Sequence, residues 1–147
     1  MKVTWAMAAT ATLHCLTGCA IGEVTGVAIG TALGFSNLGT IVLAIALAFL
    51  FGYSFTSFPL LRAGMALGAV VPLALASDTI SIGIMEIVDN TVVAVIPGAL
   101  DASLSDAAFW ASLALALLLA GLAAYPANRW LLARGKGHAV VHQHHAH

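Results

Sequence analysis

The chain has 147 residues, of which 61% are hydrophobic and 7% are charged, and its formal net charge at pH 7 is -1. Soluble domains carry roughly 25% charged residues, so this composition excludes an ordinary soluble domain and indicates a membrane protein that crosses the bilayer several times. The near-zero net charge offers no basic surface to nucleic acid, and 2 cysteines are too few for a disulfide framework.

Four apolar segments are long enough to cross a bilayer, which takes about 20 residues of helix. The first begins after Lys2 and is longer than the apolar core of a signal peptide, so we interpret it as a retained span. We expect Pro59 to close the second span and Pro97 the third, and Pro72 to open or kink the third. The sequence therefore predicts an all-α membrane protein with four transmembrane helices, at residues 3–34, 38–58, 65–96 and 106–132.

The lysines and arginines are confined to one side of this predicted bundle. They fall at the N-terminus, in the loop between the second and third spans, or near the C-terminus. Positive residues are retained on the cytoplasmic side of a membrane, so we expect both termini in the cytoplasm, the second as a histidine-rich tail over residues 135–147. The positive residues are Lys2, Arg62, Arg129, Arg134 and Lys136.

Glycine recurs at every fourth position along the first span. Small residues at this spacing let a second helix approach closely, either within the chain or in another copy of it. Because four short spans bury little surface, we also expect a homo-oligomer in the lipid bilayer. The predicted packing seam consists of Gly18, Gly22, Gly26, Gly30 and Gly34.

The first span also carries polar side chains that are costly in lipid. With about 100° of rotation per residue, Cys15, Cys19 and Glu23 share one face of the helix. His14 lies on the opposite side from Glu23, so one copy of the helix cannot place both around a single ion. We expect His14 to face a different neighbour.

The third span carries a matching polar face. Asp78, Met85 and Asp89 lie within about 60° of one another on a helix, and Glu86 lies at the edge of that face. Counted from the midpoints of the two spans, Asp78 should lie level with the cysteines, and Met85 and Glu86 level with Glu23. The sequence thus predicts two polar layers between the first and third spans, with Tyr53 of the second span joining the layer nearer the cytoplasm.

The acids of these layers have no lysine or arginine at the same depth. An isolated buried carboxylate is too costly to remain ionised, so it is protonated or bound to a cation. Thiol, thioether and imidazole groups favour Cu(I) and Zn(II), so we predict a protein that binds and transports copper or zinc. The predicted ligands are His14, Cys15, Cys19, Glu23, Asp78, Met85, Glu86 and Asp89, with a candidate second group in the tail at His138, His142, His144, His145 and His147.

Three other functions fit the same residues. The acids could titrate in a carrier coupled to protons or sodium ions, while the cysteines only pack. Cys15 and Cys19 could act as a membrane thiol oxidoreductase, although two cysteines four residues apart on a helix are poorly placed for a disulfide. The glycine seam could hold a partner in a structural or assembly subunit. The sequence contains no catalytic triad pattern, phosphate-binding loop or dinucleotide fingerprint, so we expect no enzyme of a soluble type.

Several blocks of the sequence occur together, namely LHCLTGCAIGE, LAFLFGYSF, SDTISIGIMEIVDN, IPGAL, FWASLALAL and PANRWLLARGKGHAVVH. In this combination the chain resembles, over nearly its whole length, a family of bacterial integral-membrane proteins catalogued as domain of unknown function 4396. The resemblance implies a small multi-span protein of the bacterial inner membrane and implies no activity. The residues that match the blocks are His14, Cys15, Gly18, Cys19, Glu23, Asp78, Glu86, Asp89, Asn90, Asn128 and Arg129.

Overall fold

The computed structural model describes residues 2–134, and the five tail histidines predicted to collect metal lie outside the described residues. The described chain contains helices and no strand. They are α1 (Trp5–Ala32), α2 (Asn37–Arg62), α3 (Leu67–Val95), the short 3-10 helix η1 (Ala99–Asp101) and α4 (Ala107–Ala133). Within this part of the chain, 4 helices are long and apolar enough to cross a membrane, which confirms the predicted fold class.

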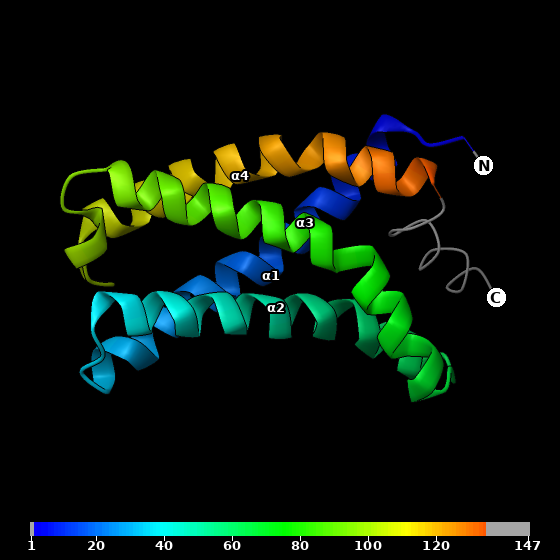
Figure 1. Ribbon diagram of the computed structural model, residues 1–147, viewed down its shortest axis with the longest axis horizontal. Coiled ribbons are helices and arrows are strands. Elements are labelled where there is room, and N and C mark those ends of the chain that lie inside the picture. The colour runs from blue at the N-terminus through cyan, green and yellow to red at the C-terminus, as the bar shows by residue number, and fades with distance from the viewer. Residues whose placement is uncertain (1, 135–147) are drawn as a thin grey trace.

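The helices form a bundle in which α1 packs most extensively on α2, and α3 on α4. Figure 1 shows α1 crossing the bundle obliquely, so that its N-terminal part lies beside α4 and its C-terminal part beside α2. The bundle has two ends, the terminal end and the loop end. The terminal end holds the start of α1, the end of α4 and the α2–α3 loop, and the loop end holds the α1–α2 loop and η1.

Glycine ends both α1 and α2. Gly34 and Gly64 have φ angles of 71° and 91°, a left-handed conformation that glycine adopts without steric cost. At the end of α1 the amide of Phe35 donates to the carbonyl of Gly30 at 2.8 Å, the hydrogen bond of a Schellman motif. Nothing lies within 4 Å of a Cβ built on Gly34. Gly34 therefore terminates α1 and takes no part in the packing seam in which the sequence analysis placed it.

The prolines act differently from one another. The prediction that Pro59 closes the second span is wrong, because α2 continues through it to Arg62. Leu60, fully buried together with Val70 of α3, holds this last turn in place. Pro72 lies inside α3, and the first turns of α3 lie at a steep angle to the rest of the helix in Figure 1. A proline removes one backbone hydrogen bond and crowds the carbonyl four residues earlier, which accounts for such a bend.

The glycine seam of α1 packs against α2 of the same chain. A Cβ added to Gly26 would lie 2.5 Å from the Cα of Ala44, and one added to Gly18 would lie 2.9 Å from the Cα of Gly52. Neither distance leaves room for a side chain, so the two backbones touch. α2 contributes small residues at the same four-residue spacing, which explains why the helices fit along several turns. The facing pairs are Gly18 and Gly52, Gly22 and Ala48, Gly26 and Ala44, and Gly30 and Thr40.

Candidate cation site between α1 and α3

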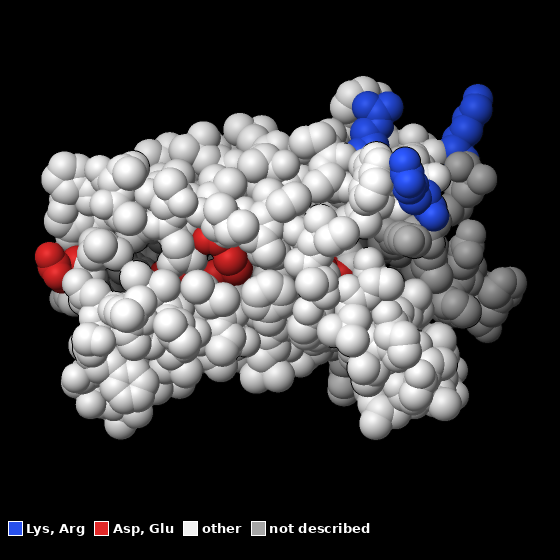
Figure 2. Space-filling model, in the orientation of Figure 1, with Lys and Arg blue, Asp and Glu red and all other residues white. Residues whose placement is uncertain are grey.

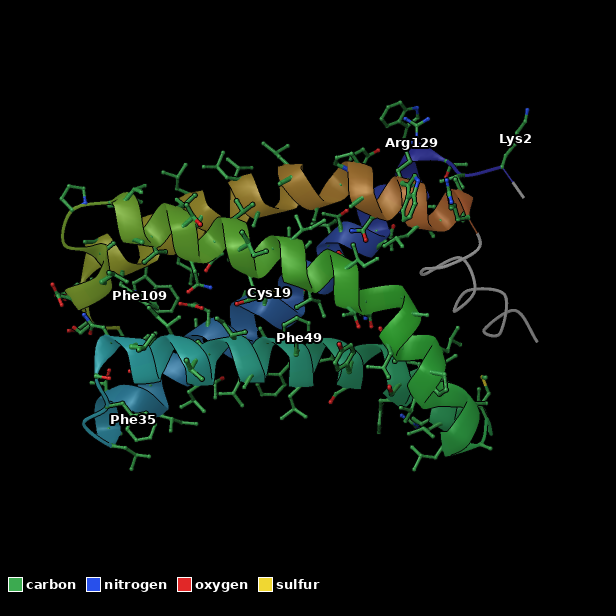
Figure 3. The ribbon with its side chains drawn as sticks, viewed as in Figure 1. Lys2, Cys19, Phe35, Phe49, Phe109 and Arg129 are labelled. Atoms are coloured by element: carbon green, nitrogen blue, oxygen red, sulfur yellow. The ribbon has the colours of Figure 1, made fainter. Side chains whose placement is uncertain are left out.

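Polar side chains of α1 and α3 meet along the inside of the bundle, beside the glycine seam. On α3 the acids Asp78 and Asp89 are 0% and 2% exposed, and Met85 between them is 0% exposed. Figure 3 shows Cys19, on α1, near the middle of the molecule. We call this set the polar column; its members are Cys15, Cys19 and Glu23 of α1 and Asp78, Ser81, Met85, Glu86 and Asp89 of α3.

The part of the column nearest the terminal end links three helices. Cys15 of α1 interacts with Asp78 and Ser81 of α3. Asp78 is also hydrogen-bonded by Thr56 of α2, and the Thr56 Oγ1 lies 3.4 Å from the Nε2 of His14. His14 thus reaches the column through a hydroxyl group, while its own ring lies against α2 and away from Glu23.

The middle of the column is a pair of sulfur atoms. The Sγ of Cys19 lies 3.9 Å from the Sδ of Met85, and Cys19 also hydrogen-bonds Glu86. Counting residues along the spans predicts Met85 level with Glu23, but the structure pairs it with Cys19, one helical turn nearer the terminal end. Because α3 bends and α1 crosses the bundle obliquely, counting residues from span midpoints misjudges depth by about one turn.

The part of the column nearest the loop end consists of acids. Glu23 interacts electrostatically with Glu86 and Asp89. Asn90 donates to the Glu86 Oε2 at 3.3 Å, whereas the buried Oδ1 of Asp89 has no hydrogen-bond partner within residues 2–134. In Figure 2 the visible lysine and arginine atoms lie at the terminal end, away from the acids, which lie mid-length and at the loop end. This grouping favours a cation, because Glu23, Glu86 and Asp89 lie close together and no ion pair to lysine or arginine joins these three within residues 2–134.

A pocket adjoins the acids at the loop end. It has a volume of about 230 Å³, and its lining includes Glu23 and Asn90 on the column side and Asn37 and Asp101 on the opposite side. The Nδ2 of Asn37 donates to the Oδ1 of Asp101 at 2.9 Å, which ties the start of α2 to η1. Figure 2 shows the surface hollowed near this end. The column can therefore be reached from the loop end through Glu23.

The donor set fits a soft metal ion better than a hard one. Among residues 2–134, no group of three or more His, Cys, Asp and Glu side chains is arranged to hold one metal ion. Methionine is not one of those four types, and the thiol of Cys19 with the thioether of Met85 forms a pair of ligands that Cu(I) prefers. The sulfur pair is the chemically most specific part of the column.

Sequence reasoning missed several polar residues that the structure brings inside. Thr56 could have been found, because it continues the four-residue spacing of small residues along α2. Asn128 of α4 donates to the Oγ1 of Thr12 at 3.0 Å, a pair that no spacing rule predicts because the two residues lie on different helices. Tyr53, expected to join the polar layers, instead shares a hydrogen bond of 2.8 Å with Thr79 at the exposed edge of α2 and α3.

These observations define a class of protein, a four-helix membrane protein with acidic and sulfur side chains buried between its helices. The model of the family described as Domain of unknown function (DUF4396) matches residues 4–137. This range covers most of the chain, so the protein belongs to that family. No curated protein and no solved structure matched the chain.

Proposed function

We propose that the protein binds a soft metal cation inside the bundle and transports it across the membrane, with Cu(I) favoured over Zn(II). The observation that carries the proposal is the sulfur pair of Cys19 and Met85, 3.9 Å apart, with Cys19 also hydrogen-bonded to the buried Glu86. Soft sulfur ligands select Cu(I), and Glu86 beside the pair would offset the charge of the ion.

The proposed route runs along the polar column. A cation enters the pocket at the loop end and meets Glu23 and Asp89. It then passes to the sulfur pair and on to Asp78 near the terminal end. Carboxylates on both sides of the sulfur pair lower the electrostatic cost of moving a positive charge through a region of low dielectric.

The proposed location is the inner membrane of a bacterium, with both termini in the cytoplasm. Support comes from the lysines and arginines, which gather at the terminal end and are retained on the cytoplasmic side. We also propose a homo-oligomer. Since α2 covers the glycine seam, a second copy would contact another surface, and light scattering of the protein in lipid nanodiscs would give the number of copies.

The first test is a Cu(I) titration of the full chain under reducing, oxygen-free conditions against a chromophoric chelator. The five tail histidines are replaced by glutamine so that they do not contribute. We expect one Cu(I) per chain, and an affinity about 10- to 100-fold lower after Met85→Leu. Cys19→Ser should reduce the affinity further, because a hydroxyl group is a poor ligand for a soft ion.

Matched variants of the other sulfur residues control this titration. Met7→Leu and Met65→Leu change methionines that pack against other clusters of the bundle, away from the polar column. Both should bind Cu(I) within about threefold of the unchanged chain, a margin well below the loss expected at a ligand. Copper binding that survives both Met85→Leu and Cys19→Ser would rule out the sulfur pair. Uptake of Cu(I) or Zn(II) into proteoliposomes then distinguishes transport from binding.

A second candidate function is proton-coupled transport without a metal. The observation in its favour is the chain from Asp78 through Thr56 to His14, since carboxyl, hydroxyl and imidazole groups can pass protons along hydrogen bonds. Acidification of metal-free proteoliposomes, reported by a trapped pH dye, tests it. Proton uptake that is lost in Asp78→Asn and unchanged in Cys19→Ser and Met85→Leu would favour this function over metal transport.

A further inference from the structure

The pocket at the loop end differs in chemistry from the sulfur pair. Neither Cys19 nor Met85 lines it. Its volume of about 230 Å³ is below the range of about 300–1,000 Å³ that drug-sized ligands occupy. The pocket therefore has room for one small molecule, and its lining shows which kind.

The lining carries negative charge and no basic residue. Its only ionisable side chains are Glu23 and Asp101, and Asp101 is already held by the amide of Asn37 at 2.9 Å. Glu23 is half-buried, accepts no hydrogen bond from any described residue and lies close to Glu86 and Asp89, which repel it. A carboxylate in this position is stabilised by a ligand that donates hydrogen bonds and carries positive charge.

The helix dipoles do not reverse the negative electrostatic potential that the acids give the pocket. Residues near the C-terminal ends of α1 and α3 and near the N-terminal ends of α2 and α4 line the pocket. Two negative helix ends thus offset two positive ones. The negative carboxylate of Glu23 therefore favours a positively charged ligand.

The rest of the lining is mixed, with an apolar wall beside neutral polar side chains. The neutral polar side chains are Thr31, Asn37, Thr40, Asn90, Ser103 and Ser112. Aromatic rings of Phe35 and Phe109 lie at the loop end in Figure 3, and both line the pocket together with aliphatic side chains. The apolar wall suits the hydrocarbon part of an organic ion, and the face of an aromatic ring attracts an ammonium group. The aliphatic side chains are Val27, Ile41, Val93, Leu100 and Leu113.

We propose that this pocket binds a small organic ammonium ion with an apolar body. The ammonium group donates hydrogen bonds to Glu23, and the hydrocarbon part packs against Phe109 and Leu113. This site does not depend on the proposed metal site, since the sulfur pair lies outside the pocket. An ammonium ion bound here occupies the entrance of the cation route and competes with a metal ion that enters from the loop end.

The test is calorimetric titration of the full chain in lipid nanodiscs with benzylammonium, and with benzyl alcohol as an uncharged molecule of similar shape. We expect benzylammonium to bind with one ion per chain and benzyl alcohol to bind at least about tenfold more weakly, because it lacks the charge-assisted hydrogen bond. In Glu23→Gln the affinity for benzylammonium should fall by at least about tenfold and that for benzyl alcohol should be unchanged.

Two further variants keep the result interpretable. Asp106→Asn removes an exposed acid at the same end that does not line the pocket, and its affinity for benzylammonium should match that of the unchanged chain. Ser112→Phe fills the pocket and should abolish binding of both molecules, while circular dichroism shows the helices intact. Equal binding of the charged and uncharged molecules, no binding at millimolar concentration, or binding that Glu23→Gln leaves unchanged would each overturn the proposal.

The copper titration separates this proposal from the metal site. Cys19→Ser should lose Cu(I) and still bind benzylammonium, whereas Ser112→Phe should lose benzylammonium and still bind Cu(I). A chain that binds copper and no ammonium ion contradicts the pocket proposal alone. One that binds the ammonium ion and no copper contradicts the metal proposal alone.

Discussion

Helix α1 packs through two faces that differ in chemistry, a glycine face against α2 and a polar face against α3. Along the glycine seam it meets α2 backbone to backbone, and only the absence of side chains permits the contact. Along the polar column it meets α3 through side chains that include acids, and burying acids in a membrane costs free energy. The seam contributes stability through close packing, whereas burying the acids of the column costs free energy. A helix that holds both shows that the seam fixes the position from which the column residues reach α3.

The largest effect is expected in the seam. In Gly22→Leu a side chain would overlap the backbone of Ala48, so we expect the free energy of unfolding to fall by about 3 kcal/mol or more. Gly83→Leu is the matched control, because nothing lies within 4 Å of a Cβ built on Gly83, and it should change stability by less than about 0.5 kcal/mol. Unfolding in mixed detergent micelles, followed by circular dichroism, measures both. Equal losses would show that the seam is not a close contact.

A substitution in the polar column should raise the free energy of unfolding, whereas one in the seam lowers it. Asp89→Asn removes a buried carboxylate whose Oδ1 has no described partner, so we expect the fold to become more stable by about 1–2 kcal/mol at neutral pH. The same variant should transport cations more slowly in proteoliposomes. A loss of stability would show that Asp89 supports the fold and would contradict the contrast between the two faces.

Asp106 is the control for the predicted gain in stability of Asp89→Asn, because its carboxylate is exposed and hydrogen-bonded. Hydrogen bonds from the backbone amide and hydroxyl of Ser103 hold the pKa of this exposed carboxyl below its usual value. A lowered pKa means that the ionised group adds stability at neutral pH, and that this contribution disappears as the pH falls through the pKa of the folded state. Asp106→Asn should therefore reduce stability slightly at neutral pH and make no difference in acid.

A smaller effect is expected where α1 meets α4. The guanidinium of Arg129 lies 3.9 Å from the ring centre of Trp5, which joins the two helices at the terminal end. We expect Arg129→Gln to cost about 1 kcal/mol, measured in the same micelle assay. The guanidinium of Arg134 lies 4.7 Å from the ring of Trp130 on its own helix, so Arg134→Gln should cost less. Equal costs would show that the contact between helices adds nothing.

The two faces also differ in how far the sequence predicts them. Spacing alone places Cys15, Cys19 and Glu23 on one side of α1, and the period of four among small residues predicts a close helix contact. Both follow from helical geometry, which is local. The pairing of Cys19 with Met85 does not, because it depends on the bend of α3 and the oblique path of α1. Sequence patterns fix which residues share a face, and the packing angles fix which faces meet.

The loop end shows the same limit. Asp101 reads as an ordinary loop residue in the sequence, and Asn37 as the start of a span. Their hydrogen bond joins positions that are 64 residues apart, so no local pattern predicts it. The pocket depends on this contact and on four helix ends, which explains why sequence reasoning found the column and missed its entrance.

The smallest effect is expected at that entrance. Asn37→Ala removes the hydrogen bond to Asp101 and should cost about 0.5–1.5 kcal/mol locally, with little change in global unfolding. Amide hydrogen exchange should become faster in η1 and stay unchanged in the middle of α1 and α2, since the seam does not depend on this contact. Asn90→Ala is the matched control, because the Asn90 amide bonds Glu86 within α3 and not η1. Faster exchange along the seam would mean that the pocket and the close-packed face are coupled. Unchanged exchange in η1 would mean that the Asn37–Asp101 hydrogen bond does not hold η1 in place.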